Sequence, residues 1–273
     1  MTKTRPARNV APILLVGCGK MGSALLAGWK ANRIPGPFHV VEPKPARRIK
    51  GAFYYSAPEK LPTRLAPAAV VLAVKPQMFD QVLPYYRRFA SSGAVTLSIA
   101  AGKTISGIAR GLGPGAAIVR AMPNTPAAIG RGISVACAGS GVTRSSRALC
   151  GRLLAAVGEV AWVEDEGLLD PVTAVSGSGP AYVFLLIEAL AKAGEESGLP
   201  ADLAEKLARA TIAGAGELAR LSSESAASLR EAVTSPGGTT RAALDVLMAP
   251  GGLESLLKRA VAAATKRSRE LAG

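Results

Sequence analysis

Short aliphatic runs recur along the first part of the chain and alternate with longer segments of mixed polarity. The runs are Ile13–Val16, Phe38–Val41, Val70–Val74, Ala94–Ile99, Ala117–Arg120, Ile133–Ala138 and Val160–Val163. Continuous apolar runs of this length are typical of strands that are buried on both faces of a sheet. Two intervening segments, Met21–Lys30 and Thr143–Val157, have the composition of helices. This alternation predicts an α/β sheet.

The pattern changes near Glu164, where the strand-like runs stop and segments rich in Ala, Leu, Glu and Lys follow. The predicted helices of this second part are Tyr182–Gly194, Ala201–Leu221, Arg230–Ala232 and Leu253–Arg269. We therefore predict two domains, an α/β domain over residues 1–164 and an all-helical domain over residues 165–273. Alanine-rich helical faces pack closely, so we expect the helical domain to associate with a second copy.

Two segments indicate where in the cell the protein is expected. Residues 1–9 are basic and lead into a strand rather than into the longer apolar region of a secretion signal, so we expect a short frayed tail. Residues 171–187 carry no charge, but glycine, proline and hydroxyl residues fill their first half, and Asp170 and Glu188 close their ends. These features favour the start of a buried helix over a membrane span. We expect a cytoplasmic protein without a membrane partner.

The first aliphatic run leads directly into a Gly-x-Gly-x-x-Gly motif at Gly17, Gly19 and Gly22. In such a motif the first glycine permits a tight turn, the second lets backbone N–H groups approach a pyrophosphate, and the third lets the next helix pack closely. Because 30 of the 273 residues are glycine, the motif alone is weak. Its position between a strand and a helix is what favours a dinucleotide site over a turn without a ligand.

The second aliphatic run is followed by charges of both signs. Glu42 lies twenty residues after Gly22, where an acidic side chain accepts hydrogen bonds from the adenosine ribose and favours NAD. Lys44, Arg47 and Arg48 follow closely and would instead hold the 2′-phosphate of NADP. The sequence leaves the choice between NADH and NADPH open.

Composition and charge narrow the function classes. The chain is 49% apolar and 19% charged, which excludes a disordered protein. Its net charge of +14 attracts anions in general, but the basic residues are scattered and aromatic residues are only 4%, which argues against nucleic-acid binding. Three widely spaced cysteines indicate neither a disulfide framework nor a zinc site, and we expect no metal site.

Side chains for acid–base or nucleophilic catalysis are scarce. His39 is the only histidine, and its place in the second run favours a structural role. The sequence offers no Ser-His-Asp or Cys-His arrangement. An enzyme of this composition can still act if a cofactor carries the reaction, as in hydride transfer, so a reductase is favoured over a hydrolase.

Four further stretches complete the pattern: Ala73–Gln77, Arg120–Ala127, Ser176–Tyr182 and Val233–Thr240. Together with the glycine motif, in this order and spacing, they resemble pyrroline-5-carboxylate reductase from about residue 10 to 270. The last stretch is the most specific, because residues 229–247 follow the family's diagnostic pattern. The glycine motif, in contrast, is shared with many dehydrogenases.

The resemblance implies a Rossmann-like NAD(P)-binding sheet followed by an all-helical dimerisation domain. It also implies NADPH- or NADH-dependent reduction of 1-pyrroline-5-carboxylate to L-proline, the last step of proline biosynthesis, by hydride transfer to the imine carbon. The implied cofactor contacts are Val16, Gly17, Cys18, Gly19, Lys20, Met21, Ala73, Val74, Lys75, Pro76, Ala100, Ala101, Gly102 and Asn124. Many members carry Ser or Arg in place of Glu42, which puts the family's usual NADPH preference in doubt here.

The implied substrate contacts are Ser235, Gly237, Gly238, Thr239 and Thr240, and their chemistry agrees with that role. The stretch has the composition of a helix start, in which proline sets the turn and two glycines expose backbone N–H groups that can bind a carboxylate. The hydroxyl of Thr240, our catalytic candidate, can hydrogen-bond the ring nitrogen of the substrate and hold the imine carbon toward the hydride.

Some roles stay open. Ser176–Pro180 either caps the next helix or contacts substrate. The side chain of Asn124 either orients the carboxamide of the cofactor or a water, or has a structural role only. Lys75 is not assigned as a proton donor, since the backbone at a strand end explains its position equally well.

Two other functions are considered. A 3-hydroxy-acid dehydrogenase-like oxidoreductase would need a lysine and an asparagine in the helical domain, and Lys192 has no clear asparagine partner. A non-catalytic dinucleotide-binding interaction protein would leave the glycines and threonines of residues 235–240 unexplained. We therefore expect a reductase that acts as a homodimer or a dimer-based higher oligomer through its helical domain.

Overall fold

The computed structural model describes residues 10–272, so the predicted frayed tail at residues 1–9 lies outside the described part. The chain forms two compact units. Unit 1 contains the residues up to Gly177 and those from Thr265 onward, and unit 2 contains Ser178–Ala264. Helix α11 (Leu253–Ala272) therefore contributes residues to both. The last strand of the sheet ends at Val163. The predicted boundary between the two domains near Glu164 stays a prediction.

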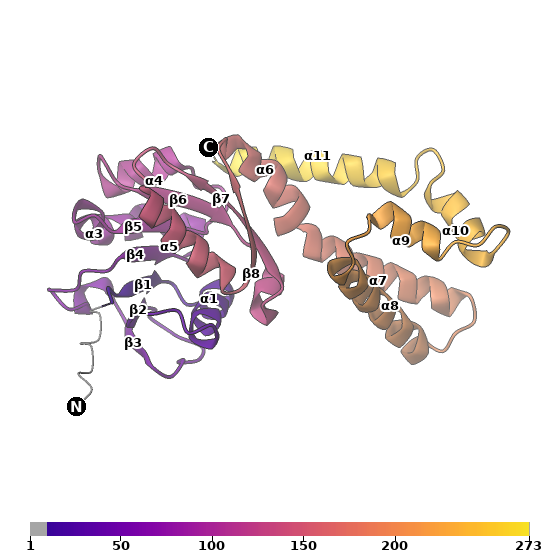
Figure 1. Cartoon of the computed structure of the whole chain (residues 1–273), viewed down its shortest axis with the longest axis horizontal. Helices are drawn as coiled ribbons and strands as arrows, with labels where there is room; N and C mark the ends of the chain where they lie inside the picture. Colours follow the sequence, from indigo (N-terminus) through magenta and orange to yellow (C-terminus); the bar gives the residue numbers. More distant parts are fainter. Residues whose placement is uncertain (1–9, 273) are drawn as a thin grey trace, which may run out of the picture. The chain divides into compact units, whose positions relative to one another are not determined.

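Unit 1 is built on an eight-stranded sheet of order β3-β2-β1-β4-β5-β6-β7-β8 (Figure 1). The strands are β1 (Ile13–Val16), β2 (Phe38–Val41), β3 (Ala52–Tyr55), β4 (Ala69–Leu72), β5 (Val95–Ser98), β6 (Ile118–Met122), β7 (Gly132–Ala138) and β8 (Gly158–Val163). All neighbours pair in parallel except β6 and β7, which are antiparallel. The predicted fold class, a mostly parallel sheet followed by helices, is confirmed.

Helices cover both faces of this sheet, and their packing explains the continuous apolar runs. Ile13 and Leu15 of β1 belong to one buried cluster, with residues of α1 (Lys20–Ala31) and α5 (Arg144–Ala155). Leu14 and Val16 belong to a second cluster on the opposite face, with residues of α2 (Phe79–Val82), α3 (Arg87–Ser91) and α4 (Ile105–Leu112). Because successive strand residues point to opposite faces, every position of β1 must be apolar.

The one strand absent from the prediction is β3. Its residues, Ala-Phe-Tyr-Tyr, are exposed or half-buried, and it lies at the edge of the sheet. An edge strand that is only partly covered does not require a continuous aliphatic run, so the pattern that predicts the other strands is missing here.

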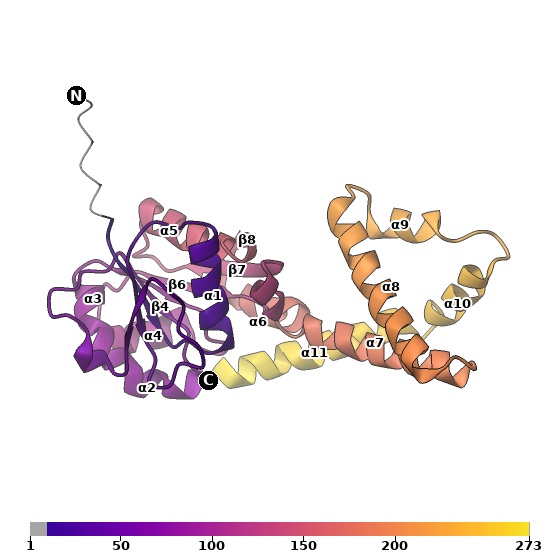
Figure 2. The same cartoon turned by 90° about the horizontal axis from the view of Figure 1, so that it is seen from below.

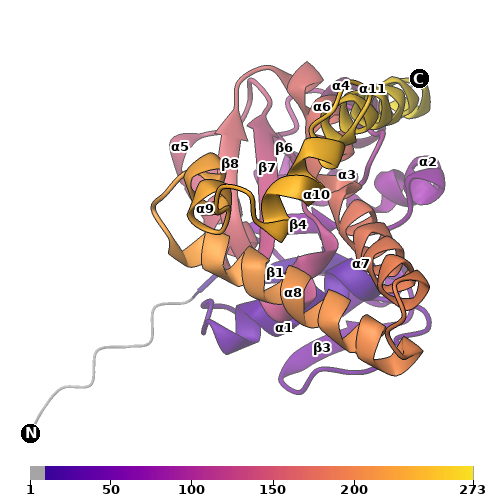
Figure 3. The same cartoon turned by 90° about the vertical axis from the view of Figure 1, so that its right-hand side faces the viewer.

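Unit 2 is helical and consists of α7 (Gly179–Glu196), α8 (Ala201–Leu221), α9 (Ala226–Ala232), α10 (Thr239–Leu247) and most of α11. Helices α7 and α8 lie against each other, as Figures 2 and 3 show. Their contact depends on small residues: Ala191 is the buried residue of α7, and Ala204 and Ala208 are those of α8.

Much of the apolar surface of α7 is uncovered. Val183, Phe184, Leu185 and Leu186 are all exposed, with Leu185 at 64%. The prediction that the segment up to residue 187 is buried within the chain is therefore wrong for its second half. Among the described residues, the helical stretch Glu166–Glu196 is long and apolar enough to cross a membrane by composition alone, and little of its most apolar part is buried.

Gly158 begins β8 at a position where no side chain fits. Its φ is 150°, and an added Cβ would overlap the carbonyl oxygen of Gly132 in β7. Gly158→Ala should lower the free energy of unfolding by about 2–4 kcal/mol, measured by urea denaturation. Gly151→Ala is the control, because a Cβ there would meet only Trp162 at ordinary contact distance inside helix α5. That control should raise stability by about 0.5–1 kcal/mol; equal effects of the two changes would contradict this explanation.

Candidate functional site

The carboxyl ends of five strands meet along one edge of the sheet. Val16 of β1 is in register with Val41 of β2 and Leu72 of β4, and the register continues through Ser98 of β5 to Arg120 of β6. The residues at and just after these strand ends therefore lie side by side: 17–22, 42, 73–76, 99–102 and 122–124. We call them the carboxyl edge. Together with Val16, the last residue of β1, it contains all the predicted cofactor residues, including Asn124, which the sequence places far from the glycine motif.

The glycine motif has the shape of an anion cradle. Gly17 has a φ of 88°, and an added Cβ would lie 2.7 Å from the carbonyl oxygen of Ala73, while one on Gly22 would overlap the carbonyl of Gly17. A Cβ on Gly19, in contrast, would have no atom within 4 Å. Helix α1 begins at Lys20, and no side chain caps its first turn in the described structure. The open backbone and the free first-turn N–H groups fit a pyrophosphate.

Glu42 is anchored beside this cradle by two backbone hydrogen bonds. The N–H of Cys18 donates to Glu42 Oε2 at 2.8 Å, and the N–H of Lys44 donates to Oε1 at 3.1 Å. A negative charge is thus held at the end of β2, next to the turn that follows β1. This is the position at which the hydroxyls of an adenosine ribose would be recognised.

Cations lie close by, along the outer side of α1. They line a groove of about 580 Å³ that has no acidic residue among its walls; the cations are Lys20, Lys30, Arg47, Arg48 and Lys50. Arg48 also stacks over the ring of Tyr54, with its guanidinium carbon 5.6 Å from the ring centre. Of the three cations that the sequence analysis named, Arg47 and Arg48 line this groove and Lys44 does not.

The loops after β4 and β5 complete the central part of the edge. Strand β4 ends at Leu72, so Lys75 lies three residues beyond it, immediately before a short 3₁₀ helix that starts at Pro76. In the second loop Gly102 has a φ of 69°, and an added Cβ would lie 3.0 Å from the carbonyl oxygen of Leu271 in α11. The last turns of α11 therefore pack directly on the loop that contains Ala100–Gly102.

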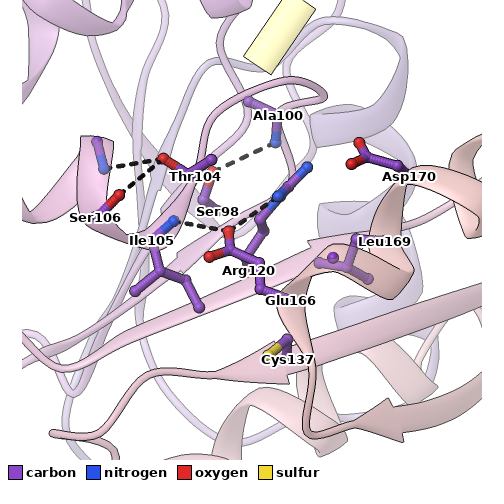
Figure 4. Close-up of polar contacts among 12 residues, drawn as sticks. Ser98, Ala100, Thr104, Ile105, Ser106, Arg120, Cys137, Glu166, Leu169 and Asp170 are labelled. Carbon is purple, nitrogen blue, oxygen red and sulfur yellow. Dashed lines mark hydrogen bonds and ion pairs between the residues drawn. The ribbon is translucent and has the colours of Figure 1, made fainter. Parts of the chain in front are cut away.

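A buried ion pair supports this second loop. Arg120 is only 5% exposed, and its guanidinium donates to Glu166 Oε1 at 2.9 Å. The same oxygen accepts the N–H of Ile105, the first residue of α4, at 2.8 Å (Figure 4). Glu166 thus joins β6 to the start of α4. This pair was not predicted from the sequence, although the charged residue at the end of the run Ala117–Arg120 is a signal that could have pointed to it.

Asn124 and His39 both make structural contacts. Asn124 Oδ1 accepts the N–H of Ile133 at 2.9 Å and so braces the start of β7. His39 Nδ1 lies 2.9 Å from the hydroxyl of Tyr55, and its ring stacks with Phe53 and Tyr55. Burial lowers the pKa of His39, which favours the neutral imidazole in this aromatic stack.

The predicted substrate residues lie together in unit 2, at the start of α10. Ser235–Gly238 forms a type II turn, in which Pro236 precedes Gly237 at a φ of 70° and the N–H of Gly238 donates to the carbonyl of Ser235 at 3.1 Å. Helix α10 begins at Thr239, with Gly238 at its N-cap, and no side chain caps it in the described residues. Its first-turn N–H groups are therefore available to an anion.

The stretch Ser176–Pro180 differs from the capped helix start that we considered. Helix α6 (Leu169–Val172) continues through one π-helical segment, Thr173–Gly177, into α7, and the side chain of Ser178 makes no capping hydrogen bond. The Oγ atom of Ser176 is buried and has no hydrogen-bond partner in the described structure.

Comparisons with known proteins agree with this geometry. A family model described as pyrroline-5-carboxylate reductase dimerisation matches residues 166–271, and one described as NADP oxidoreductase coenzyme F420-dependent matches residues 12–102. The chain is 39% identical to the pyrroline-5-carboxylate reductase of Pseudomonas aeruginosa over 95% of its own length and 96% of that protein.

Solved structures give the same result. A pyrroline-5-carboxylate reductase from Coxiella burnetii has a TM-score of 0.88 at 34% identity and covers 97% of this chain and 100% of its own. The pyrroline carboxylate reductase of Plasmodium falciparum, solved with NADP bound, has a TM-score of 0.83 at 29% identity and covers 98% and 100%.

The Arg120–Glu166 pair should be important for stability. Glu166→Ala would leave a buried guanidinium without its partner and should lower the free energy of unfolding by about 2–4 kcal/mol. The control is Glu205→Ala, because the Glu205–Arg209 pair is well exposed on α8 and should contribute less than about 0.5 kcal/mol. Chemical denaturation of both variants tests this difference, and equal losses would mean that burial of Arg120 does not matter.

Proposed function

The chain belongs to the pyrroline-5-carboxylate reductase family, and on that premise we propose how its residues reduce 1-pyrroline-5-carboxylate to L-proline with NAD(P)H. The observation that carries the assignment is the match to members of this family along about 95% of the chain, which includes both units. The protein is thus an oxidoreductase that acts on a CH–NH bond, in the last step of proline biosynthesis.

The reaction needs positioning more than acid–base side chains. NAD(P)H, when bound, supplies a hydride to the imine carbon, and the ring nitrogen gains a proton. The protein must therefore hold two ligands so that the reacting carbons are close and aligned. This requirement agrees with an edge built from backbone N–H groups, glycines and small residues.

We assign the cofactor to the carboxyl edge. The open backbone at Gly19 and the first-turn N–H groups of α1 would hold the pyrophosphate. The loops 73–76 and 100–102 lie on the side of β4 and β5, away from Glu42, and would hold the nicotinamide half. The Asn124 side chain, which already accepts a hydrogen bond from Ile133, would support this end through the backbone.

We assign the substrate carboxylate to the start of α10. The turn at Ser235–Gly238 directs the free N–H groups of Thr239 and Thr240 outward from the helix end, so an anion can bind without a cationic side chain. The hydroxyl of Thr240, in the first turn of the same helix, would hydrogen-bond the ring nitrogen and set the direction of the imine carbon.

The anchored carboxylate of Glu42 favours NADH. Two backbone N–H groups hold it at the place where NADPH carries its 2′-phosphate, and a fixed negative charge there repels a phosphate while accepting hydrogen bonds from ribose hydroxyls. The basic groove along α1 opposes this preference, since its cations attract the additional phosphate. We expect Glu42 to have the larger effect on the cofactor preference, because it would contact the ribose directly, whereas the charges of the groove are partly screened by solvent.

The helical unit supports a dimer-based assembly. An apolar groove of about 490 Å³ lies between α7 and α8, lined by residues such as Leu190, Leu199 and Leu207. This groove and the exposed apolar residues of α7 lie within residues 166–271, the range that the dimerisation family model matches. We propose a homodimer, or a larger assembly of such dimers, in the cytoplasm, with a second copy rather than a membrane or a nucleic acid against this surface.

The activity itself can be tested directly. The purified protein should oxidise NAD(P)H, followed at 340 nm, when 1-pyrroline-5-carboxylate is added, and L-proline should form in equal amount. A 3-hydroxy acid offered with NAD(P)+ should give no turnover. Absence of turnover with the pyrroline and either cofactor would overturn the assignment.

Thr240→Ala should lower kcat by about ten- to a thousandfold through lost positioning, with cofactor affinity nearly unchanged. Thr240→Ser is the matched control, because it keeps the hydroxyl, and it should retain most of the activity. Steady-state kinetics of both variants, with the dissociation constant of NAD(P)H from titration, make the test. Wild-type turnover of Thr240→Ala would remove the proposed role of this hydroxyl.

Glu42→Ser should shift the ratio of kcat/KM values from NADH toward NADPH by about tenfold or more, because it removes the charge that repels the 2′-phosphate. Glu42→Gln separates charge from shape, since it keeps the side-chain length and should shift the ratio in the same direction. If neither variant alters the ratio, the basic groove and not Glu42 determines the preference.

A further inference from the structure

One polar group near the carboxyl edge is left without a partner. The Oγ atom of Ser176 is buried from solvent and makes no hydrogen bond in the described structure. A buried hydroxyl without a partner is unusual, because it has lost its hydrogen bonds to water and gained none in return. Such a group indicates that a partner absent from the free chain completes it.

The local backbone supports the same conclusion. Ser176 lies in the π-helical segment Thr173–Gly177, which interrupts the path from α6 to α7. Short π-helical segments are rare and frequent at functional sites, because they redirect side chains away from regular helical positions. In the same segment the hydroxyl of Thr173 donates to the carbonyl of Leu169 at 2.7 Å, the ordinary arrangement for a helical hydroxyl. Ser176 makes no such bond.

The next residue places Ser176 at the edge. A Cβ added to Gly177 would lie 2.6 Å from the Cε atom of Met122, so the backbone of the π-helical segment packs closely on the last residue of β6. Only Pro123 separates Met122 from Asn124, and all these residues belong to unit 1. Ser176 is therefore next to the end of β6, on the side of β5 that lies away from β1 and β2.

This end of the edge is where the nicotinamide ring belongs. A dinucleotide lies across the carboxyl edge with its pyrophosphate at the glycine motif. Glu42 marks the adenosine side at β2, so the nicotinamide half extends over β4 and β5 toward β6. Two other polar side chains here already have partners within the chain: Asn124 Oδ1 accepts a backbone N–H, and Arg120 is paired with Glu166.

The other buried hydroxyl without a partner is that of Tyr86, among the described residues, and it has different surroundings. Tyr86 lies in the apolar cluster beneath α2–α4, with Phe89 stacked beside it. Its burial in that core, among apolar side chains, raises its pKa. Ser176 is thus the unpartnered hydroxyl that neighbours the carboxyl edge.

We propose that the Ser176 hydroxyl binds the carboxamide of the nicotinamide ring and so sets the orientation from which the hydride leaves; this rests on the cofactor assignment above. A serine hydroxyl both donates and accepts, which matches the C=O and NH₂ groups of a carboxamide. The carboxamide is the polar group that fixes the rotation of the ring. The role requires no proton transfer by Ser176.

The test compares ligands that differ only in the nicotinamide. In the full-length protein, Ser176→Ala should raise the dissociation constant of NAD(P)H about two- to tenfold, the effect of one lost hydrogen bond, as measured by calorimetric titration. Binding of the matching ADP-ribose, which has no nicotinamide, should not change. The melting temperature of the free protein should stay the same or rise, because the variant removes a buried hydroxyl that has no partner.

Thr173→Val is the matched control. It removes a hydroxyl from the same π-helical segment, but one that already has a partner within the chain, so it should lower the melting temperature and leave both ligand affinities unchanged. Equal weakening of NAD(P)H and ADP-ribose by Ser176→Ala would overturn the proposal, because it would indicate a general disturbance of the edge. Unchanged binding of NAD(P)H would also overturn it, as would a raised KM for the pyrroline alone.

Discussion

The site depends on a close approach of backbone to backbone at the ends of β1 and β4. There the turn at Gly17 comes so near the carbonyl of Ala73 that a Cβ would not fit, and Gly22 packs equally tightly on Gly17. This contact sets the direction in which α1 starts and leaves the backbone at Gly19 uncovered. The anion cradle is thus a consequence of how tightly a helix and a parallel sheet can pack when three positions carry no side chain.

Because the site is formed largely by backbone groups and small residues, it promotes hydride transfer by positioning the two ligands. The described carboxyl edge has one anchored carboxylate, Glu42, and the substrate turn has hydroxyls and free N–H groups, but neither needs a side chain that gains or loses a proton. The accuracy with which the ligands are positioned then depends on the contacts that hold the binding loops in place. The Arg120–Glu166 pair and the packing of α11 on Gly102 hold the loop after β5, so the elements that make no direct contact with ligands determine how well the loop is placed.

The sequence predicted those features of the fold that depend on a single short segment. The central strands were predictable because burial on both faces favours continuous apolar runs, as in β1 and β4, and the start of α10 was predictable from Ser-Pro-Gly-Gly. The edge strand β3 is not fully buried, so its residues need not be aliphatic. The Arg120–Glu166 pair depends on register between distant segments, which no single segment shows. The exposure of α7 was missed because an apolar helix has the same composition whether its own chain or a second copy covers it.

The most direct test is a crystal structure of the protein with NAD(P)+ and L-proline bound together. We predict that the pyrophosphate contacts the backbone N–H groups of residues 19–21, that the nicotinamide lies toward β6, and that the proline carboxylate is held by the first-turn N–H groups of α10. A nicotinamide on the β2 side of the glycine motif, or a carboxylate bound by a lysine or arginine side chain instead, would contradict this prediction.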